Sequence, residues 1–288
     1  MFTPDQYELL DFGEGRKLER FGPYVIDRSA AAADRTRKAE LVDWQAADAR
    51  FLRPRHGSAK WLPDGVLPAC WTIEHPTCKL ELRPTPFGHL GVFAEQAANW
   101  DWIVRRVHAS DRPWRVLNLF AYTGGSTLAA ASAGAQVVHV DAAKNVIEWA
   151  RHNAQLTGLQ QAPIRWITED VRRFTERELR RGNRYDAIIL DPPSYGHGPR
   201  GEAWKIELHL PELLHVCREL TDNRLALLLL TCHSPRWDPS RIRAILGEKL
   251  FGTNPPNLTT KALHLQTADG RQLPCGLMAR WPDGRDQL

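Results

Sequence analysis

The sequence predicts an α/β protein, in which a doubly wound and mostly parallel sheet closes on an antiparallel hairpin and follows a small α+β subdomain. Two observations predict this fold. After residue 86, apolar runs of strand length alternate with helical patterns, which is typical of a parallel sheet covered by helices. Before residue 86, short strand-like segments are separated by Gly and Pro, which indicates a smaller β-rich unit.

The first 85 residues are expected to form this β-rich α+β subdomain. Its strand-like segments are Tyr24–Ile26, Trp71–Ile73 and Leu80–Leu82. The polar, Ala- and Arg-rich stretch Ser29–Phe51 is expected to be helical. We therefore predict two domains, residues 1–85 and 86–288.

The second domain alternates predicted strands with predicted helices. The strands are Val116–Phe120, Gln136–Val140, Ile164–Ile167, Tyr185–Leu190 and Arg224–Thr231. The helices are Ser126–Ala133, Lys144–Leu156, Val171–Arg180, Trp204–Leu220 and Pro239–Leu250. The chain then ends in a predicted hairpin, Ala262–Thr267 and Leu273–Trp281, around a turn at Asp269-Gly270. Pro274 lacks an N–H, so it suits an edge strand.

The composition is that of a soluble protein, with 43% hydrophobic and 25% charged residues among 288. No apolar run reaches the ~18 residues of a membrane span, and the acidic, polar start is unlike a signal peptide. The five scattered cysteines form no C-x-x-C pair, so we expect reduced thiols and no metal site. These features predict a cytoplasmic protein without a membrane partner, and leave open a monomer or a homodimer.

Basic residues gather beside aromatic ones in two clusters, although the net charge is only +4. The first cluster is Arg53, Arg55, His56, Lys60 and Trp61, and the second is Arg105, Arg106, His108, Arg112, Trp114 and Arg115. Such clusters could hold phosphates beside a substrate cleft. A solvated surface face is the alternative.

The stretch from Val116 to Asp141 reads as a strand, a Thr123-Gly124-Gly125 loop, a helix and a second strand that ends in a carboxylate. In an open parallel sheet, ligands bind beyond the carboxyl ends of the strands, where this loop lies. Adjacent glycines let backbone approach a ligand, and Asp141 can accept hydrogen bonds from ribose hydroxyls. A nucleoside-containing cofactor is therefore implied. The alternative is a tight turn and a helix cap.

The glycine spacing discriminates between such cofactors. The pattern G-x-G-x-x-G, which brings a helix N-terminus onto a pyrophosphate, is absent, because the next glycine after Gly125 is Gly134. A cofactor without phosphates fits better than NAD, and S-adenosylmethionine is the common one.

Several motifs together resemble the class I S-adenosylmethionine-dependent methyltransferases. They are LNLFAYTGGSTLAAASAGA, Asp141, WARHNAQLTGL, EDVRRF and DPPSYG, in this order. More narrowly, they resemble the bacterial large-subunit ribosomal RNA methyltransferase family that includes cytosine-5 and guanine-N7 enzymes. Upstream, RKLERFGPYVIDR resembles that family's small β-rich subdomain, and GVFAEQAANWDWI the segment that leads into its catalytic domain. The family's N-terminal PUA-type domain has no room before Arg16, so the first subdomain is a candidate for contact with substrate RNA.

The resemblance implies a Rossmann-like methyltransferase fold and a set of cofactor contacts. The loop around the methionine part of the cofactor would comprise Asn118, Phe120, Tyr122, Thr123 and Gly124. Asp141 would hold the ribose, Asp170 the adenine amino group and Val171 the adenine ring; a helix N-cap is the alternative for Asp170. Little acid–base machinery is needed, because a sulfonium already carries an excellent leaving group.

In the implied fold, Asp191-Pro192-Pro193 lies beside the methyl group, where Asp191 would touch both cofactor and substrate. The prolines have no N–H, so their carbonyls and the Asp191 carboxylate can accept hydrogen bonds from the amino group of a base. Tyr195 could stack on a base extruded from its helix. The alternative is a proline turn with Tyr195 packed on it.

Cys232 ends the fifth predicted strand at the same edge of the sheet. A thiolate there could add to C6 of cytosine and make C5 nucleophilic toward the methyl group. Thr231-Cys232 resembles the cysteine motif of the cytosine-5 enzymes, although His233 follows where those have Ser. The alternative is a buried packing cysteine.

The resemblance predicts an S-adenosylmethionine-dependent methyltransferase that acts on an RNA base, with ribosomal RNA as partner and C5 of cytosine as first target. A purine nitrogen held by Asp191-Pro192-Pro193 is the second target. An RNA-binding or assembly protein without turnover, and methylation of a small molecule or a protein, are the remaining alternatives.

Overall fold

The computed structural model describes residues 1–53, 58–222 and 224–283, which divide into two compact units. The first unit comprises Met1–Ala98 and His264–Cys275, and the second comprises Asn99–Leu263 and the residues from Gly276 onward. The expected boundary at residue 86 lies inside the first unit, because the chain remains there until helix α1 (Ala97–His108) begins. The functional division into two domains stays a prediction.

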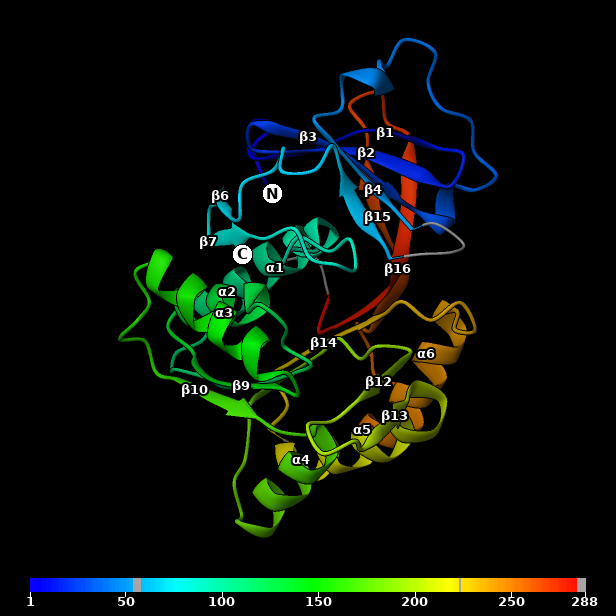
Figure 1. The fold of residues 1–288 in the computed structure, drawn as a ribbon. Coiled ribbons are helices and arrows are strands. Elements are labelled where there is room, and N and C mark those ends of the chain that lie inside the picture. The colour runs from blue at the N-terminus through cyan, green and yellow to red at the C-terminus, as the bar shows by residue number, and fades with distance from the viewer. Residues whose placement is uncertain (54–57, 223, 284–288) are drawn as a thin grey trace. The chain divides into compact units, whose positions relative to one another are not determined.

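The first unit is built on a five-stranded sheet in the order β1-β2-β3-β4-β5 (Figure 1). Its strands are β1 (Tyr7–Gly13), β2 (Arg16–Phe21), β3 (Tyr24–Ser29), β4 (Ala49–Leu52) and β5 (Lys60–Leu62). β3 and β4 are parallel, and the other neighbours are antiparallel. β6 (Trp71–His75) and β7 (Cys78–Leu82) form a hairpin. The predicted β-rich character is confirmed. Short 3₁₀ turns are η1 (Ala31–Ala33), η2 (Trp44–Ala46) and η3 (Ala94–Gln96).

The helix predicted for Ser29–Phe51 is wrong, because the chain between β3 and β4 forms only two 3₁₀ turns in an irregular path, and the end of the segment belongs to β4. The cause lies in a distant carboxylate. Asp11 of β1 is fully buried and accepts hydrogen bonds from the Ala39 N–H at 3.0 Å and from the Trp44 indole N–H at 2.6 Å. A buried carboxylate needs such donors, so the segment follows Asp11 rather than its local helix propensity.

The second unit contains the predicted doubly wound sheet. Its seven strands have the order β10-β9-β8-β11-β14-β16-β15. β8, β9, β10, β11 and β14 are parallel, whereas β16 is antiparallel to β14. The strands are β8 (Arg115–Leu119), β9 (Gln136–Asp141), β10 (Ile164–Thr168), β11 (Ala187–Leu190), β14 (Leu227–Cys232), β15 (Thr259–Gln266) and β16 (Gln272–Trp281). This Rossmann-like order, with antiparallel strands at its end, confirms the predicted fold class.

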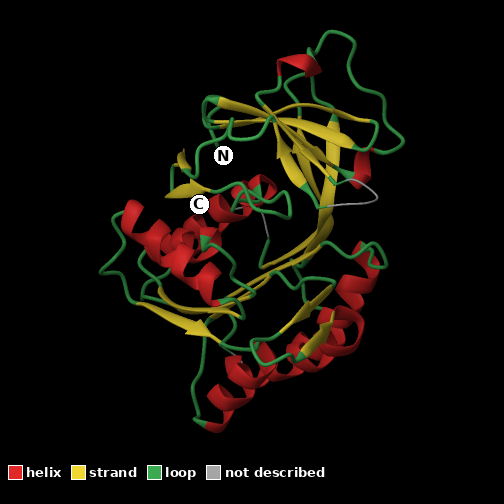
Figure 2. Cartoon of the chain, in the orientation of Figure 1, coloured by secondary structure: helices red, strands yellow, loops and turns green. Residues whose placement is uncertain are grey.

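Helices cover both faces of the parallel strands (Figures 1 and 2). On one face lie α1, α2 (Gly125–Ser132) and α3 (Lys144–Leu156), and on the other α4 (Val171–Arg180), α5 (Ile206–Thr221) and α6 (Pro239–Ile245). α6 continues into a π-helical turn, η4 (Leu246–Phe251). A small hairpin of β12 (Tyr195–His197) and β13 (Ala203–Lys205), which the sequence did not predict, follows β11.

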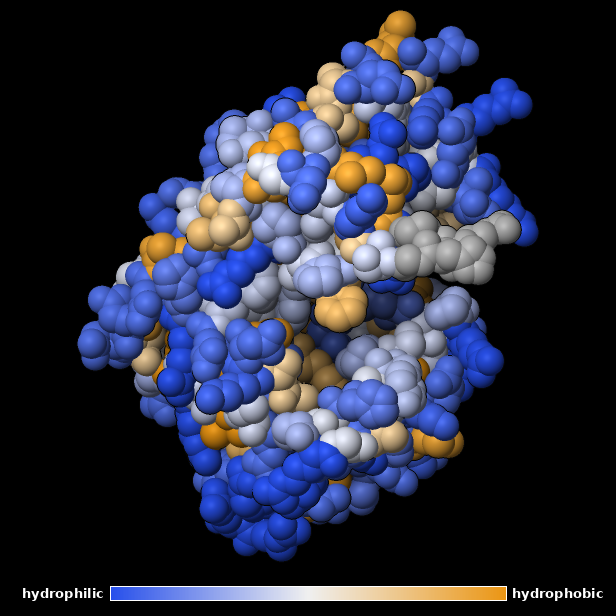
Figure 3. Space-filling model, in the orientation of Figure 1, coloured by the Kyte–Doolittle hydropathy of each residue, from blue (hydrophilic) through white to orange (hydrophobic). Residues whose placement is uncertain are grey.

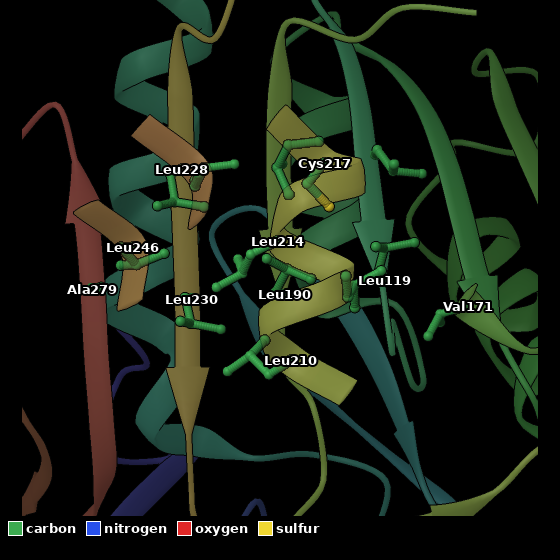
Figure 4. Close-up of a cluster of buried hydrophobic side chains, with 14 of the residues drawn as sticks. Leu119, Val171, Leu190, Leu210, Leu214, Cys217, Leu228, Leu230, Leu246 and Ala279 are labelled. Atoms are coloured by element: carbon green, nitrogen blue, oxygen red, sulfur yellow. The ribbon is translucent and has the colours of Figure 1, made fainter. Parts of the chain in front are cut away.

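The core explains why the strands read as continuous apolar runs. Successive side chains of a strand point to opposite faces, and both faces are covered here, so both sets must be apolar. One face packs against α5 (Figure 4), in a buried cluster that includes Leu117, Leu119, Leu190, Leu210, Leu214, Cys217, Leu228 and Leu230.

The predicted C-terminal hairpin is present, but its edge strand is β15 and not β16. Pro274 is tolerated in β16 because the pairing of β16 with β14 covers only Leu277–Trp281. At position 274, no N–H is therefore needed to donate a hydrogen bond to β14. Just before β16, Arg271 donates to the buried Asp11 carboxylate and lies over the ring of Phe12, 4.8 Å from its centroid. The tip of the hairpin thus belongs to the first unit.

Among the helices of the described chain, none is long and apolar enough to cross a membrane. The face drawn in Figure 3 is mostly hydrophilic, with scattered apolar residues. All five cysteines are free thiols, as predicted.

Two leucines of α5 test this packing. Leu214 is fully buried against the sheet, so Leu214→Ala should lower the free energy of unfolding by about 2–5 kcal/mol through the cavity it leaves. Leu208 is 60% exposed, so Leu208→Ala should change it by less than about 0.5 kcal/mol. Urea unfolding of both variants measures the difference. Equal losses would contradict the assigned buried face of α5.

Candidate active site

The predicted site residues follow the carboxyl ends of the parallel strands. The loop of residues 120–124 follows β8, Asp141 ends β9, Asp170 follows β10, Asp191 follows β11 and Cys232 ends β14. These strands are neighbours in the sheet, so their carboxyl ends lie at one edge. The fold of the second unit therefore brings the predicted residues together.

The loop after β8 has a strained backbone. Phe120 and Tyr122 have φ angles of 57° and 50°, in the left-handed region that non-glycine residues rarely adopt. Such a conformation costs about 1–3 kcal/mol per residue and persists only where neighbours enforce it. Here the Ala121 N–H donates to the Val140 carbonyl at 3.1 Å, and the Asn153 side chain donates to the Thr123 carbonyl at 2.9 Å. A loop held against strain in this way is preorganised.

The two glycines of the loop meet different requirements. Gly124 has a φ of 95° and precedes α2 as its N-cap. At Gly125, a Cβ would lie 2.4 Å from the Trp100 ring, so only glycine fits against α1. Both glycines are therefore needed for the turn and its packing, as the alternative of a tight turn proposed, and not only for approach to a ligand.

Asp141 is tied to the same loop. Its Oδ2 accepts the Tyr122 N–H and its Oδ1 accepts the Ala143 N–H, both at 3.0 Å. Burial raises the pKa of Asp141 above its usual value, and backbone N–H groups, those of Ala143 and Tyr122 among them, oppose the shift. Each carboxylate oxygen has a second lone pair, so Asp141 can brace the loop and still accept ribose hydroxyls.

Asn118 takes part in a buried polar chain. Its amide donates to Thr127 Oγ1 at 2.9 Å, and that oxygen lies 2.9 Å from His139 Nδ1. Burial lowers the pKa of His139 to about 3, so the imidazole is neutral. The chain joins β8, α2 and β9 beneath the loop. Contact between Asn118 and a cofactor stays a prediction.

Asp170 is the N-cap of α4, as its alternative interpretation expected. Its Oδ1 accepts the N–H groups of Arg172 and Arg173 at 3.1 and 3.2 Å. Oδ2 takes no part in these two bonds, so capping and recognition of an amino group are compatible. Val171 is 3% exposed and packs in the core cluster, and its contact with the adenine ring also stays a prediction.

The carboxylate of Asp191 is fixed from the neighbouring strand. Thr231 Oγ1 donates to Oδ1 at 2.5 Å, and His233 Nε2 lies 3.2 Å from the same oxygen. The Asp191 side chain is still 31% exposed, so it is both oriented and open to a ligand. The close approach of His233 depends on Gly276, where a Cβ would lie 2.8 Å from His233 Nδ1. This anchoring role of Thr231 and His233 is not predicted from the sequence.

A third missed residue is Trp204, which joins the proline motif to the loop after β8. Its indole N–H donates to the Pro193 carbonyl at 2.7 Å, and its ring centroid lies 4.7 Å from that of Phe120. One of the two predicted carbonyl acceptors is therefore already bonded. The Pro192 carbonyl and Asp191 remain the candidate acceptors for a base.

The side chain of Tyr195 lies at the surface and contacts His197. Its side chain is 56% exposed, with the ring edge-on to His197 and the hydroxyl 3.0 Å from His197 Nε2. The ring is accessible on β12, which begins two residues after Pro193, and stacking on a base stays a prediction.

Cys232 is 1% exposed at the end of β14. Burial raises the pKa of its thiol, the Ser234 N–H opposes the shift, and the nearby charge of Asp191 adds to it. In this conformation the sulfur is a protonated, packed thiol.

The two basic clusters predicted from the sequence lie in different parts of the structure. Arg112, Trp114 and Arg115 lie at the amino end of β8, opposite the edge that carries the site, and Arg112 forms a bidentate ion pair with Asp186 at 2.6 and 2.9 Å. For these three residues, the expectation that the cluster flanks the cleft is wrong. In the first cluster, Arg55 and His56 lie outside the described residues, and Arg53 is exposed in the first unit.

Comparison with known proteins identifies a family and several proteins that are similar to this chain. A model of the S-adenosylmethionine-dependent methyltransferase family matches residues 30–222. Proteins named ribosomal RNA large subunit methyltransferase I are similar: that of Aeromonas hydrophila is 36% identical over 118 residues, and that of Salmonella arizonae 28% over 246. These matches cover 40% and 78% of this chain, but only 27% and 57% of the relatives.

Two solved structures are also similar. The S-adenosylmethionine-dependent methyltransferase from Agrobacterium tumefaciens is 40% identical, with a TM-score of 0.89, and the match covers 97% of this chain and 91% of that one. A candidate methyltransferase from Streptococcus mutans, 18% identical with a TM-score of 0.73, shares the fold over 96% of this chain and 75% of its own.

The pKa of Asp141 gives a pH prediction. If Asp141 holds the ribose, hydroxyls donate to its ionised carboxylate, so affinity for S-adenosylmethionine should fall as the pH falls through the raised pKa of Asp141, beginning at a higher pH than for an ordinary aspartate. Asp141→Asn should remove this pH dependence and weaken binding about 10-fold or more, since hydrogen bonds to a charged group contribute about 1.5–3 kcal/mol. Calorimetric titration across pH measures both effects.

Glu176→Gln is the matched control, because Glu176 is an exposed acid on α4. It should bind the cofactor as the wild type does at every pH. If Asp141→Asn behaves like Glu176→Gln, Asp141 does not hold the ribose.

Proposed function

Because the chain belongs to the S-adenosylmethionine-dependent methyltransferase family, we propose that it methylates a base of RNA, with ribosomal RNA as substrate and C5 of cytosine as the first target. The enzyme class and the cofactor follow from the family. The RNA substrate is supported by distant homology to ribosomal RNA large subunit methyltransferase I. The proposal places the reaction in the cytoplasm, where ribosomal RNA is methylated.

One arrangement carries the proposal. β11 lies between β8 and β14, so Asp191 stands between the loop after β8 and Cys232. A base whose amino group donates to Asp191 and to the Pro192 carbonyl would have the cofactor loop on one side and the thiol on the other. The exposed ring of Tyr195 is the candidate stacking partner of that base.

The residues present fit the cofactor. The carboxylate of Asp141 offers acceptors for the ribose, and Asp170 offers Oδ2 for an amino group. When bound, the cofactor supplies a methyl group on a positively charged sulfur, and the resulting thioether is a good leaving group. The chain's own task is to hold the target atom in line with that methyl, which the strained loop and the fixed Asp191 serve.

Methylation at C5 of cytosine also needs Cys232. The thiolate would add to C6, C5 would take the methyl group, and loss of the C5 proton would then expel the thiolate. Burial holds the thiol protonated, so its proton must leave when the base binds. Asp191 is the nearby carboxylate that would accept a hydrogen bond from the N4 amino group and share a proton with N3 as negative charge develops on the ring during this step.

The state of Cys232 favours a second candidate, methylation of a purine nitrogen. A nitrogen owns a lone pair and needs placement without covalent activation. A cysteine that is 1% exposed and has a raised pKa is better suited to packing in the core than to acting as a nucleophile. Asp191 and the Pro192 carbonyl would then hold the purine.

Two kinds of measurement test the proposal. Mass spectrometry of nucleosides from ribosomal RNA of cells with and without the protein should show one methylated base missing, and its identity names the target. Unchanged nucleosides, together with no methyl transfer to isolated ribosomal RNA in vitro, would refute an RNA substrate.

Cys232→Ala separates the two chemistries. For a cytosine-5 enzyme, the variant should lose at least ~10³-fold in turnover while it keeps cofactor affinity, because no other group adds to C6. RNA with 5-fluorocytosine at the target should trap the wild-type protein covalently, since fluorine does not leave as a proton does. Cys217→Ala is the control, because Cys217 is also fully buried and burial raises its pKa to about 12.

The purine alternative makes the opposite prediction. Cys232→Ala should then turn over near the wild-type rate, like Cys217→Ala, whereas Asp191→Asn should be severely impaired with its cofactor affinity retained. Covalent trapping would contradict this alternative.

A further inference from the structure

A cavity of about 340 Å³ lies within the first unit, and none of the residues of the methyltransferase site lines it. A volume of this order is typical of small-ligand sites. Its lining comes from β2, β3, β4 and the segment that follows β7, and includes Lys17, Glu19, Arg28, Arg53, Phe87 and His89. All of these residues belong to one unit, so the cavity is independent of how the two units are placed.

The floor of the cavity is a built ionic network. Glu19 is 1% exposed, and it accepts two hydrogen bonds from the Arg28 guanidinium, at 2.8 and 2.6 Å, and one from the Tyr7 hydroxyl at 3.0 Å. Lys17 Nζ lies 3.0 Å from the same carboxylate. Two cations thus face one buried acid, and Arg28 is held in place by a further bond to the Gly88 carbonyl at 3.1 Å.

The cavity carries an excess of positive charge. Lys17, Arg28 and Arg53 line it against two carboxylates, Glu19 and Glu95. His89 responds to this field: desolvation and the charges of Arg28, Lys17 and Arg53 lower its pKa. A pocket in which cations disfavour a further positive charge favours an anion.

An aromatic side chain stands at this positive pocket. Phe87 lines the cavity and is nevertheless 69% exposed, an unusual state for a large apolar ring. The turn that presents it is enforced by Gly88, whose φ is 83° and where a Cβ would lie 2.6 Å from the Phe51 ring. A second ring, Phe93, lines the cavity in edge contact with His89, with centroids 5.6 Å apart.

We propose that this cavity binds one unpaired nucleotide of the RNA substrate, with its base stacked on Phe87 and its phosphate held by Lys17 and Arg53. An exposed aromatic ring beside cations is the chemistry that single-stranded nucleic acid requires, because bases stack on the ring while cations take the phosphates. Duplex binding needs cations along a backbone but no exposed ring, because paired bases cannot reach one. The inference rests on the proposed RNA substrate and assigns the first unit a site that holds it.

Two pairs of variants test the site by fluorescence anisotropy with a single-stranded RNA of about 12 nucleotides. Phe87→Ala should weaken binding about 5- to 150-fold, the effect of losing one stacked base. Leu41→Ala, at a fully exposed leucine of the same unit, should bind as the wild type does. Arg53→Ala should weaken binding and lower the slope of log affinity against log salt by about one, whereas Arg35→Ala, at another exposed arginine, should not.

Kinetics provide the second readout. Phe87→Ala should raise the KM for RNA and leave kcat at saturating RNA unchanged, because the site holds substrate without touching the reacting atoms. Calorimetric affinity for S-adenosylmethionine should equal that of the wild type, which also verifies that the second unit is folded.

The outcomes separate this inference from the proposed function. If the wild type methylates RNA but Phe87→Ala and Arg53→Ala bind RNA like Leu41→Ala and Arg35→Ala, the inference is wrong and the function stands. A duplex of the same sequence that competes as well as the single strand would refute stacking on Phe87. If the wild type neither binds nor methylates RNA, the proposed function fails and the inference fails with it.

Discussion

The parallel pairing of β10, β9, β8, β11 and β14 is the constraint on which the rest of the structure depends. It places the carboxyl ends of five strands along one edge, so that Asp141, Asp191 and Cys232, far apart in sequence, all lie at that edge. It also requires helices on both faces, and hence the apolar strands that form the core. Fold and site therefore follow from the same hydrogen-bonding pattern.

The site is organised by carboxylates that support backbone before they meet a ligand. Asp141 braces the strained Tyr122 backbone, and Asp170 caps α4. Asp191 is itself held by Thr231 and His233. These contacts restrict the conformation of the site before a ligand binds, so that less conformational entropy is lost on binding.

The sequence predicted what depends on local periodicity and chain order, and missed what depends on distant partners. Lys144–Leu156 and Val171–Arg180 occur as predicted, because amphipathic spacing decides a helix that packs on a sheet. The helix expected for Ser29–Phe51 failed because the carboxylate of Asp11 attracts its donors across the sheet. Trp204 was missed for the same reason, since its bond to Pro193 spans a hairpin whose strands carry no clear period.

The C-terminal hairpin has a consequence for the order in which the chain becomes structured during synthesis. Residues His264–Cys275 complete the first unit, and Arg271 reaches back to Asp11 near the start of the chain. A buried carboxylate without its cation is costly, so the first unit is not complete until Arg271 has been synthesised. The second unit has all of its parallel strands before then, so its sheet can assemble first, which reverses the usual N-terminal lead in multidomain folding.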